Sequence, residues 1–144
     1  YYLGGDMDNV IDVLRDKGLK ITPQRRAVIN ALLNCGPFST ALQILEYVKK
    51  SQPDVSLDTV YRNLSLFKQL GIVNEIQMIN QDGNRFEISR DGHHHHIICL
   101  KCGKIECLQK CPVSKEAIET IEKNGFAVVS HSLEFYGYCC GCQK

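Results

Sequence analysis

The sequence predicts an α+β protein with two parts: a helical N-terminal part that ends in a β-hairpin, and a smaller α/β C-terminal part. Three observations support this prediction. Apolar residues recur with helical spacing up to Gly71. Asp82 and Gly83 then form a strong turn signal between two short strand-like runs. Two Cys-x-x-Cys motifs, beginning at Cys99 and Cys139, enclose the last third of the chain.

Four helices are expected before Gly71, in segments 9–18, 21–36, 39–50 and 55–71. Each of the last three begins with a side chain that can cap a helix N-terminus. The expected caps are Thr22, followed by Pro23 at the first helical position, then Ser39 or Thr40, and Ser56. Gly18 and Gly71 are natural C-terminal stops.

Short helices followed by a hairpin are the pattern of a winged helix, although a generic helical domain with one hairpin has the same order. We therefore predict a winged-helix domain at 7–88, a linker at 89–92 and an α/β domain at 93–144. Within the last domain we expect strands at 96–100 and 104–108, a helix at 114–124 and a long strand at 126–138.

Composition narrows the class of protein. The formal net charge is +1, so any DNA contact must come from locally clustered cations. No apolar run approaches the roughly 20 residues that span a bilayer, and no export signal is visible. We therefore expect a cytoplasmic protein without a membrane partner. In that setting its 8 cysteines are expected to be reduced and to bind metal.

The two Cys-x-x-Cys pairs predict a structural zinc site made of Cys99, Cys102, Cys139 and Cys142. Four thiolates form a closed tetrahedral shell with no open position for a substrate. The alternatives are a redox motif or free thiols, but neither pair opens a helix after a strand. Cys140 lies between two of these ligands in the sequence and is not assigned to the site.

The run 93–96 contains four histidines, and alternate residues of a strand face the same side. His94 and His96 share one face, where Glu87 and Cys107 are in a position to join them. Imidazole nitrogens are suitable ligands for zinc, iron, nickel or copper. This face is a candidate regulatory metal site.

His93 and His95 share the opposite face. His131 and Glu116 are the expected partners there, which gives a candidate second regulatory site. Glu119 and Glu122 compete with Glu116, because helical carboxylates usually face solvent.

The stretches "SLDTVYRNLSLFKQLGIV", "HHHHIICLKCGKI" and "HSLEFYGYCCGC" resemble the ferric uptake regulator (Fur) family of bacterial metal-sensing repressors. The resemblance implies a DNA-binding domain at 7–88 and a dimerisation domain at 93–144. It implies a homodimer that binds operator DNA, with structural zinc and a regulatory metal near the hinge. It implies neither an enzyme nor a small-molecule substrate.

Within that family, three features resemble the zinc uptake regulator (Zur) branch. They are the additional histidine in the run 93–96, the thiol of Cys107 and the "CPV" at 111–113. Soft ligands favour Zn²⁺ at the regulatory site, with Fe²⁺ or Mn²⁺ as the alternative and an iron or peroxide sensor as the runner-up. Glu87 stands where zinc sensors often have Cys. Asn74 and Glu75 both lie near the expected hinge ligand, and Glu75 is chemically the better one.

The resemblance also places DNA contacts. Tyr61 and Arg62, next to Thr59, are expected to reach base edges or phosphates from the recognition helix. Phosphate contacts are expected from Lys20, Arg25 and Arg26. The alternatives are that Tyr61 is a core aromatic and that the arginines belong to the solvated surface.

The expected mechanism is a population shift in which metal acts as corepressor and favours the closed, DNA-binding arrangement of the dimer. Two other classes of function compete with it. A zinc-dependent enzyme requires an open metal position and a general base, and no HExxH-type motif is present. A zinc-knuckle module that binds RNA or protein does not require the four histidines.

Overall fold

The computed structural model describes residues 6–79, 81–89 and 93–144. The chain divides into two compact units, Tyr1–Asp91 and Gly92–Lys144. Three residues of the expected linker, 90–92, lie outside the described residues. No helix in the described ranges is long and apolar enough to span a membrane.

The first unit contains the four expected helices, and the predicted α+β fold class is confirmed. The helices are α1 (Met7–Asp16), α2 (Pro23–Asn34), α3 (Ala41–Val48) and α4 (Leu57–Gln69). Thr22, Thr40 and Ser56 each accept a backbone N–H from the third residue of the following helix. At α3 the side chain of Gln43 also bonds the Thr40 backbone, which completes a capping box.

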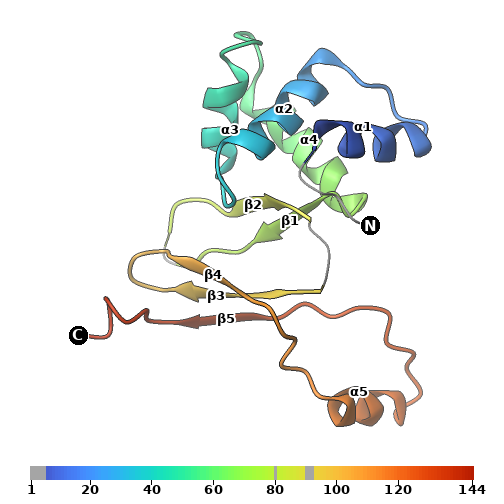
Figure 1. Cartoon of the computed structure of the whole chain (residues 1–144), viewed down its shortest axis with the longest axis vertical. Helices are drawn as coiled ribbons and strands as arrows, with labels where there is room; N and C mark the ends of the chain where they lie inside the picture. Colours follow the sequence, from blue (N-terminus) through green and yellow to red (C-terminus); the bar gives the residue numbers. More distant parts are fainter. Residues whose placement is uncertain (1–5, 80, 90–92) are drawn as a thin grey trace. The chain divides into compact units, whose positions relative to one another are not determined.

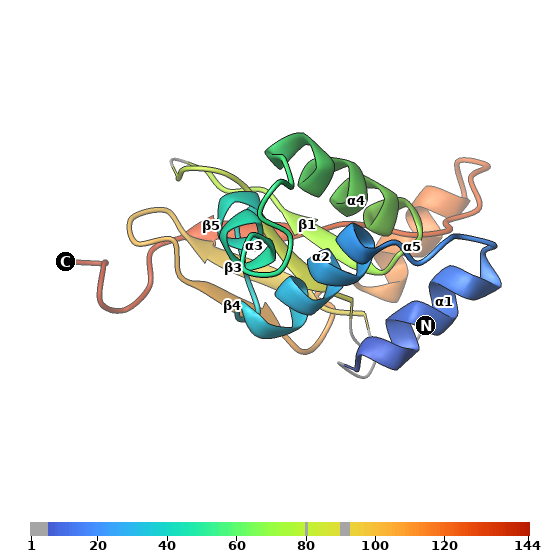
Figure 2. The same cartoon turned by 90° about the horizontal axis from the view of Figure 1, so that it is seen from above.

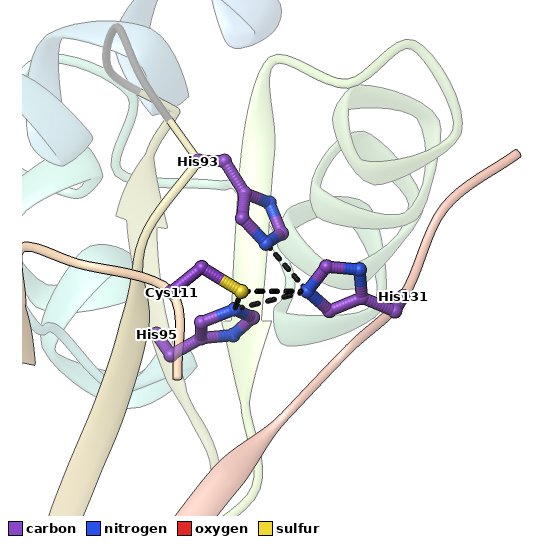
Figure 3. A group of neighbouring side chains, drawn as sticks. All are labelled: His93, His95, Cys111 and His131. Atoms are coloured by element: carbon purple, nitrogen blue, oxygen red, sulfur yellow. Dashed lines mark hydrogen bonds between the residues drawn. The ribbon is translucent and has the colours of Figure 1, made fainter. Parts of the chain in front are cut away.

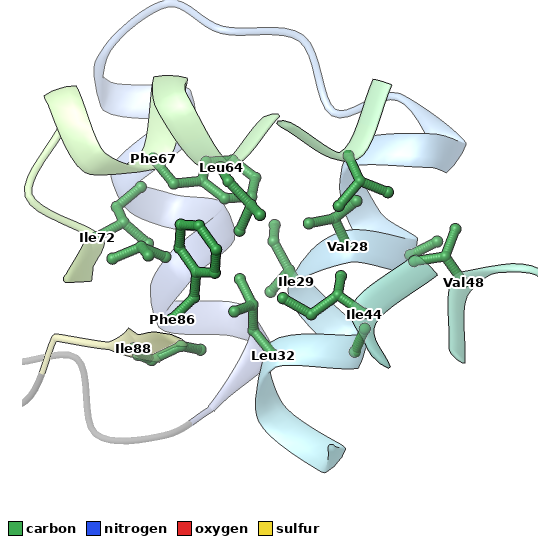
Figure 4. Close-up of a cluster of buried hydrophobic side chains, with 14 of the residues drawn as sticks. Val28, Ile29, Leu32, Ile44, Val48, Leu64, Phe67, Ile72, Phe86 and Ile88 are labelled. Atoms are coloured by element: carbon green, nitrogen blue, oxygen red, sulfur yellow. The ribbon is translucent and has the colours of Figure 1, made fainter. Parts of the chain in front are cut away.

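The core of this unit lies where α2, α3 and α4 meet (Figures 2 and 4). Ile29 of α2, Ile44 of α3 and Phe67 of α4 are fully buried there. The apolar stripe of each helix therefore supplies one wall of a shared core. This packing fixes α4 against α2, which matters for the surface that the two helices present.

A β-hairpin, the wing, follows α4 in the first unit. Strands β1 (Val73–Ile76) and β2 (Arg85–Ile88) pair in antiparallel register below the helices (Figure 1). Gly71 has φ 73°, a left-handed value that suits glycine and ends α4 just before the wing. Ser39 forms an isolated bridge with Phe86 of β2, so the wing is also hydrogen-bonded to the segment that precedes α3.

The second unit is a three-stranded sheet with one helix. Its elements are β3 (His95–Cys99), β4 (Ile105–Leu108), α5 (Lys115–Glu122) and β5 (Glu134–Gly137). The central strand β3 pairs antiparallel with β4 and parallel with β5. The helix expected at 114–124 is present as α5, and Ser114 is its N-cap.

The long strand expected at 126–138 is wrong, because only the last part of it, β5, is a strand. Residues 126–133 are irregular, and Phe126 and Val129 are 69% and 94% exposed. A strand requires a neighbour for its backbone hydrogen bonds, and β3 pairs with this segment only from Glu134 onward. The alternating pattern alone does not reveal where the neighbouring strand ends.

Candidate metal centres and nucleic-acid interface

Four cysteines of the second unit form a compact cluster. The Sγ atoms of Cys99, Cys102, Cys139 and Cys142 all lie within 4.8 Å of one another. Cys102 and Cys139 are 3.7 Å apart, and a tetrahedral Zn²⁺ with Zn–S bonds of about 2.3 Å separates its sulfurs by about 3.8 Å. The cluster can therefore hold zinc, and its sulfurs come from the β3–β4 turn and from the C-terminal tail.

Backbone hydrogen bonds prepare one of these thiols to lose its proton. The N–H groups of Cys102 and Cys139 lower the pKa of Cys99 to about 6. Hydrogen bonding to Cys139 and burial raise the pKa of Cys142 to about 12.

A second cluster combines three imidazoles with a thiol (Figure 3). Nε2 of His131 lies 2.7 Å from Nε2 of His93, 3.2 Å from Nε2 of His95 and 3.2 Å from Sγ of Cys111. Nε2 of His95 lies 3.3 Å from the same sulfur. Around a tetrahedral Zn²⁺ such donors are about 3.3–3.6 Å apart, so a small expansion of this cluster accommodates the ion.

The carbonyl of Leu133 fixes the ring of His95. This carbonyl lies 3.2 Å from Nδ1, so Nδ1 carries the proton and Nε2 presents its lone pair to the cluster. Burial, and next the charges of His93 and His131, lower the pKa of His95, which favours the neutral, metal-binding form.

The composition of this second cluster differs from the predicted set of ligands. His93, His95 and His131 come together as expected, but the fourth donor is Cys111 and not Glu116. Glu116 is exposed in the first turn of α5, where its own backbone N–H and the Ser114 hydroxyl lower the pKa of its carboxyl. The "CPV" at 111–113 was the available sequence signal for the missed cysteine.

The opposite face of β3 carries a third group of donors. The ligand atoms of His94, His96 and Cys107 lie within 4.8 Å of one another, and the two imidazole rings are 5.0 Å apart. His96 pairs in register with Cys107 of β4 and with Glu134 of β5, so the three lie in one row across the sheet. The sequence did not indicate Glu134, which accepts a 2.6 Å hydrogen bond from Tyr136.

The two carboxylates predicted to come from the wing both belong to the first unit. Glu87 on β2 accepts a hydrogen bond from Asn74 at 3.3 Å. Glu75 on β1 lies 3.1 Å from Lys68 of α4 in an ion pair. Glu75 is therefore paired with the cation of Lys68, whereas Glu87 accepts a hydrogen bond from the neutral amide of Asn74.

The outward face of α4 carries the residues predicted to contact bases. Tyr61 is 46% exposed, and Arg62 is exposed and paired with Asp58 at 2.9 Å. Thr59 lies half-buried beside the N-cap Ser56, whose hydroxyl is 3.0 Å from its own. The exposed side chains are thus on the side of α4 away from its buried core face.

The cations predicted to contact phosphates are placed in two different ways. Lys20 and Arg26 are exposed at the start of α2. Arg25 is half-buried, and its guanidinium donates to the Lys20 carbonyl and, at 3.3 Å, to the side-chain oxygen of Asn63 on α4. Lys20 and Arg26 are thus exposed cations, whereas the guanidinium of Arg25 is held in place by hydrogen bonds.

A winged-helix unit followed by a unit with clusters of cysteine and histidine defines a metal-binding regulator of the DNA-binding type. Residues 16–136 match the sequence model of the Ferric uptake regulator family. The chain belongs to this family, whose members are transcription regulators that bind metals and DNA and act as dimers.

Relatives match over nearly the whole chain. The peroxide-responsive repressor PerR of Staphylococcus aureus strain Mu50 is 34% identical over 138 residues, which cover 96% of this chain and 92% of PerR. The Fur structure of Helicobacter pylori, with three functional metal binding sites, has a TM-score of 0.74 and 26% identity, covering 96% of this chain and 91% of that one. Vibrio cholerae Fur has a TM-score of 0.68 and 29% identity, covering 89% and 98%.

Proposed function

We propose that this chain is a zinc-responsive transcriptional repressor, of the Zur kind, that binds pseudo-palindromic operator DNA as a homodimer when its regulatory site is loaded. The observation that carries the zinc assignment is the presence of a thiol in each histidine cluster: Cys111 beside His95, and Cys107 in register with His96. Thiolate with imidazole suits Zn²⁺, whereas harder carboxylate ligands suit Mn²⁺.

The proposed regulatory site combines His94, His96 and Cys107 of the second unit with Glu87 of the first. Glu75 is the alternative ligand from the first unit, and its ion pair with Lys68 makes it the weaker choice. Ligands taken from both units bind best when the units adopt one arrangement, so metal binding shifts the population toward it. Such couplings are typically about 1–3 kcal/mol.

The four-cysteine cluster is proposed as a structural zinc site and the His93, His95, Cys111 and His131 cluster as a further metal site. Four thiolates around one ion leave no open ligand position for a substrate. The proposed role of the chain is regulatory and not catalytic, in keeping with the transcription regulators of the matched family.

The proposed homodimer is supported by the exposed apolar surface of the second unit. No residue of α5 is buried, and Ile121, Phe126 and Val129 are 45%, 69% and 94% exposed. A second copy of the chain is the occupant that the family implies for this surface. Each copy then contributes one α4 to neighbouring half-sites of the operator, about one helical turn apart.

The test is a metal titration of DNA binding. The zinc-loaded protein first selects a duplex from a random-sequence library, and that duplex becomes the probe. Fluorescence anisotropy then measures affinity for the probe at buffered free Zn²⁺, Fe²⁺ and Mn²⁺. We expect Zn²⁺ to promote binding at the lowest free concentration, and promotion by Fe²⁺ but not by Zn²⁺ would contradict the assignment.

A peroxide- or iron-responsive repressor is the second candidate, favoured by the 34% identity to S. aureus PerR. The same titration, repeated with hydrogen peroxide added to the Fe²⁺-loaded protein, separates the two. Release of the probe by peroxide only in the Fe²⁺ form would favour the second candidate.

A further inference from the structure

Asn63 is a buried polar residue of α4, whereas its neighbours Tyr61 and Arg62 are exposed. It is only 8% exposed, in a helix face otherwise formed by Val60, Leu64 and Phe67. A buried amide in such a face requires partners, because an unsatisfied one costs the desolvation of its polar atoms.

Both ends of this amide have partners. Nδ2 donates to the Thr59 carbonyl at 2.9 Å, within α4. Oδ1 accepts from Nε of Arg25 at 3.3 Å, across to α2. The internal bond prevents the amide from turning, so Oδ1 is aimed at α2 and Asn63 links the two helices.

A second hydrogen bond holds the guanidinium of Arg25 in place. Its Nη1 donates to the Lys20 carbonyl, just before α2, while its backbone N–H bonds the N-cap hydroxyl of Thr22 at 3.1 Å. Both acceptors of the guanidinium, the side-chain Oδ1 of Asn63 and the backbone carbonyl of Lys20, are neutral oxygens. They orient the planar guanidinium without neutralising its charge.

The hydrogen-bonded pair Asn63 and Arg25 lies at the wall of a polar pocket of about 380 Å³ in the first unit. Thr22 and Arg25 from the start of α2, and Thr59 and Asn63 from α4, line it. The guanidinium is therefore placed at an accessible hollow between the two helices and is not sealed in the core.

We propose that Asn63 is a positioning residue for DNA binding: it holds Arg25 against α4, so that a phosphate contact from α2 and base contacts from α4 are presented at fixed spacing. This inference rests on the proposed DNA-binding function. A pre-ordered guanidinium loses less rotamer freedom when it meets a phosphate, so the bridge strengthens binding without contacting a base.

The experiment uses the full-length, zinc-loaded protein and the selected duplex, with affinity measured over a range of salt concentrations. The variants are Arg25→Ala, Arg25→Lys, Asn63→Ala and the double variant Arg25→Ala/Asn63→Ala. Asn30→Ala is the matched control, because Asn30 is an exposed asparagine of α2 that bonds Asn34.

We expect Arg25→Ala to reduce the slope of log affinity against log salt by about 0.9, the value of one lost phosphate contact. Asn63→Ala and Arg25→Lys each keep a cation at this position, so we expect them to bind the duplex more weakly than the wild type at every salt concentration, with a smaller change of slope. Arg25→Lys keeps the charge but lacks the forked donor that reaches both oxygens. The double variant is expected to bind no more weakly than Arg25→Ala, because the two substitutions affect the same contact between Arg25 and a phosphate. Asn30→Ala is expected to match the wild type.

Wild-type affinity and salt slope in Arg25→Lys would overturn the inference, and this variant decides the matter if Asn63→Ala fails to fold. Fully additive losses in the double variant would also overturn it. If the wild-type protein shows no metal-dependent binding to any duplex, the proposed function itself fails. Metal-dependent binding by the wild type, with the same affinity in Asn63→Ala and Arg25→Lys, would refute this inference alone.

Discussion

Nε2 of His95, on the central strand of the second unit, lies 3.3 Å from Sγ of Cys111, in the connection between β4 and α5. Nδ1 of the same ring faces the carbonyl of Leu133, so the nitrogen that meets the sulfur carries a lone pair. His131 closes the group from the segment before β5. Three separate parts of the chain thus each contribute a donor atom to this cluster.

Cys111→Ser is expected to remove a metal-binding thiolate from this group. Its affinity for Co²⁺, used as a spectroscopic substitute for zinc, is expected to fall by more than the roughly 10–100-fold typical of a supporting residue. The thiolate-to-metal charge-transfer absorption of the site is expected to disappear with it. Titration followed by absorption spectroscopy measures both.

Glu116→Gln is the matched control for that measurement, because Glu116 is exposed and outside the cluster. It is expected to leave the Co²⁺ titration unchanged. The opposite pattern, with Glu116→Gln weakening the site and Cys111→Ser leaving it intact, would return the site to the set of ligands expected from the sequence.

Cys99→Ser is expected to release zinc from the four-cysteine cluster and to abolish cooperative unfolding of the second unit. Its sheet has three short strands, and metal binding to such a site supplies folding free energy directly. Metal analysis and thermal denaturation by circular dichroism provide the readouts. Cys140→Ser, at an exposed position outside the cluster, should behave as the wild type; equal losses in both variants would count against the assignment.

Cys107→Asp is expected to reduce the advantage of Zn²⁺ over Mn²⁺ in promoting DNA binding, because a carboxylate is a harder ligand than a thiolate. The metal-buffered anisotropy titration measures the ratio of the two activation midpoints. Glu106→Gln is a suitable control, since Glu106 pairs with Ile97 in the register and faces the other side of the sheet. An unchanged ratio in Cys107→Asp would exclude Cys107 from the regulatory site.

Arg62→Ala is expected to weaken binding to the selected duplex by about 1–3 kcal/mol, or roughly 5–150-fold, the usual value of a good base contact. Arg15→Ala is the comparison, because Arg15 is an exposed arginine of α1 that is also paired with an aspartate, Asp12. Full affinity in Arg62→Ala would remove this residue from the DNA interface.

Val129→Lys is expected to weaken self-association of the zinc-loaded protein. The side chain is 94% exposed in the single chain, so the substitution costs the monomer little but places a charge in an apolar contact. Light scattering over a dilution series gives the dissociation constant. A dimer of unchanged stability would place the contact between copies elsewhere on the second unit.

Local signals in the sequence were enough to predict most of the fold. The helices α2, α3 and α4 begin at the expected caps, because a hydroxyl that bonds the N–H three residues later acts within one helical turn. The two halves of the four-cysteine cluster were equally predictable, since each Cys-x-x-Cys pair brings its own two sulfurs together.

Contacts between distant segments were harder to predict. Glu116 was expected as the fourth donor of the second cluster, whereas the donor that the fold brings there is Cys111, in the connection before α5. The extent of β5 likewise depended on where β3 offers a partner, which the alternation of residues 126–133 does not encode. Arg25 was predicted as a surface cation, and only the packing of α2 on α4 reveals its contact with Asn63.

The sequence by itself determined the order of helices and strands, the two faces of the histidine strand and the two Cys-x-x-Cys pairs, because each depends on residues within a few positions of one another. The tertiary structure alone decided that Cys111 joins His93, His95 and His131, and that Asn63 holds Arg25. In these cases the contacting atoms lie 16 to 38 residues apart in the chain, and only the folded backbone sets their distance.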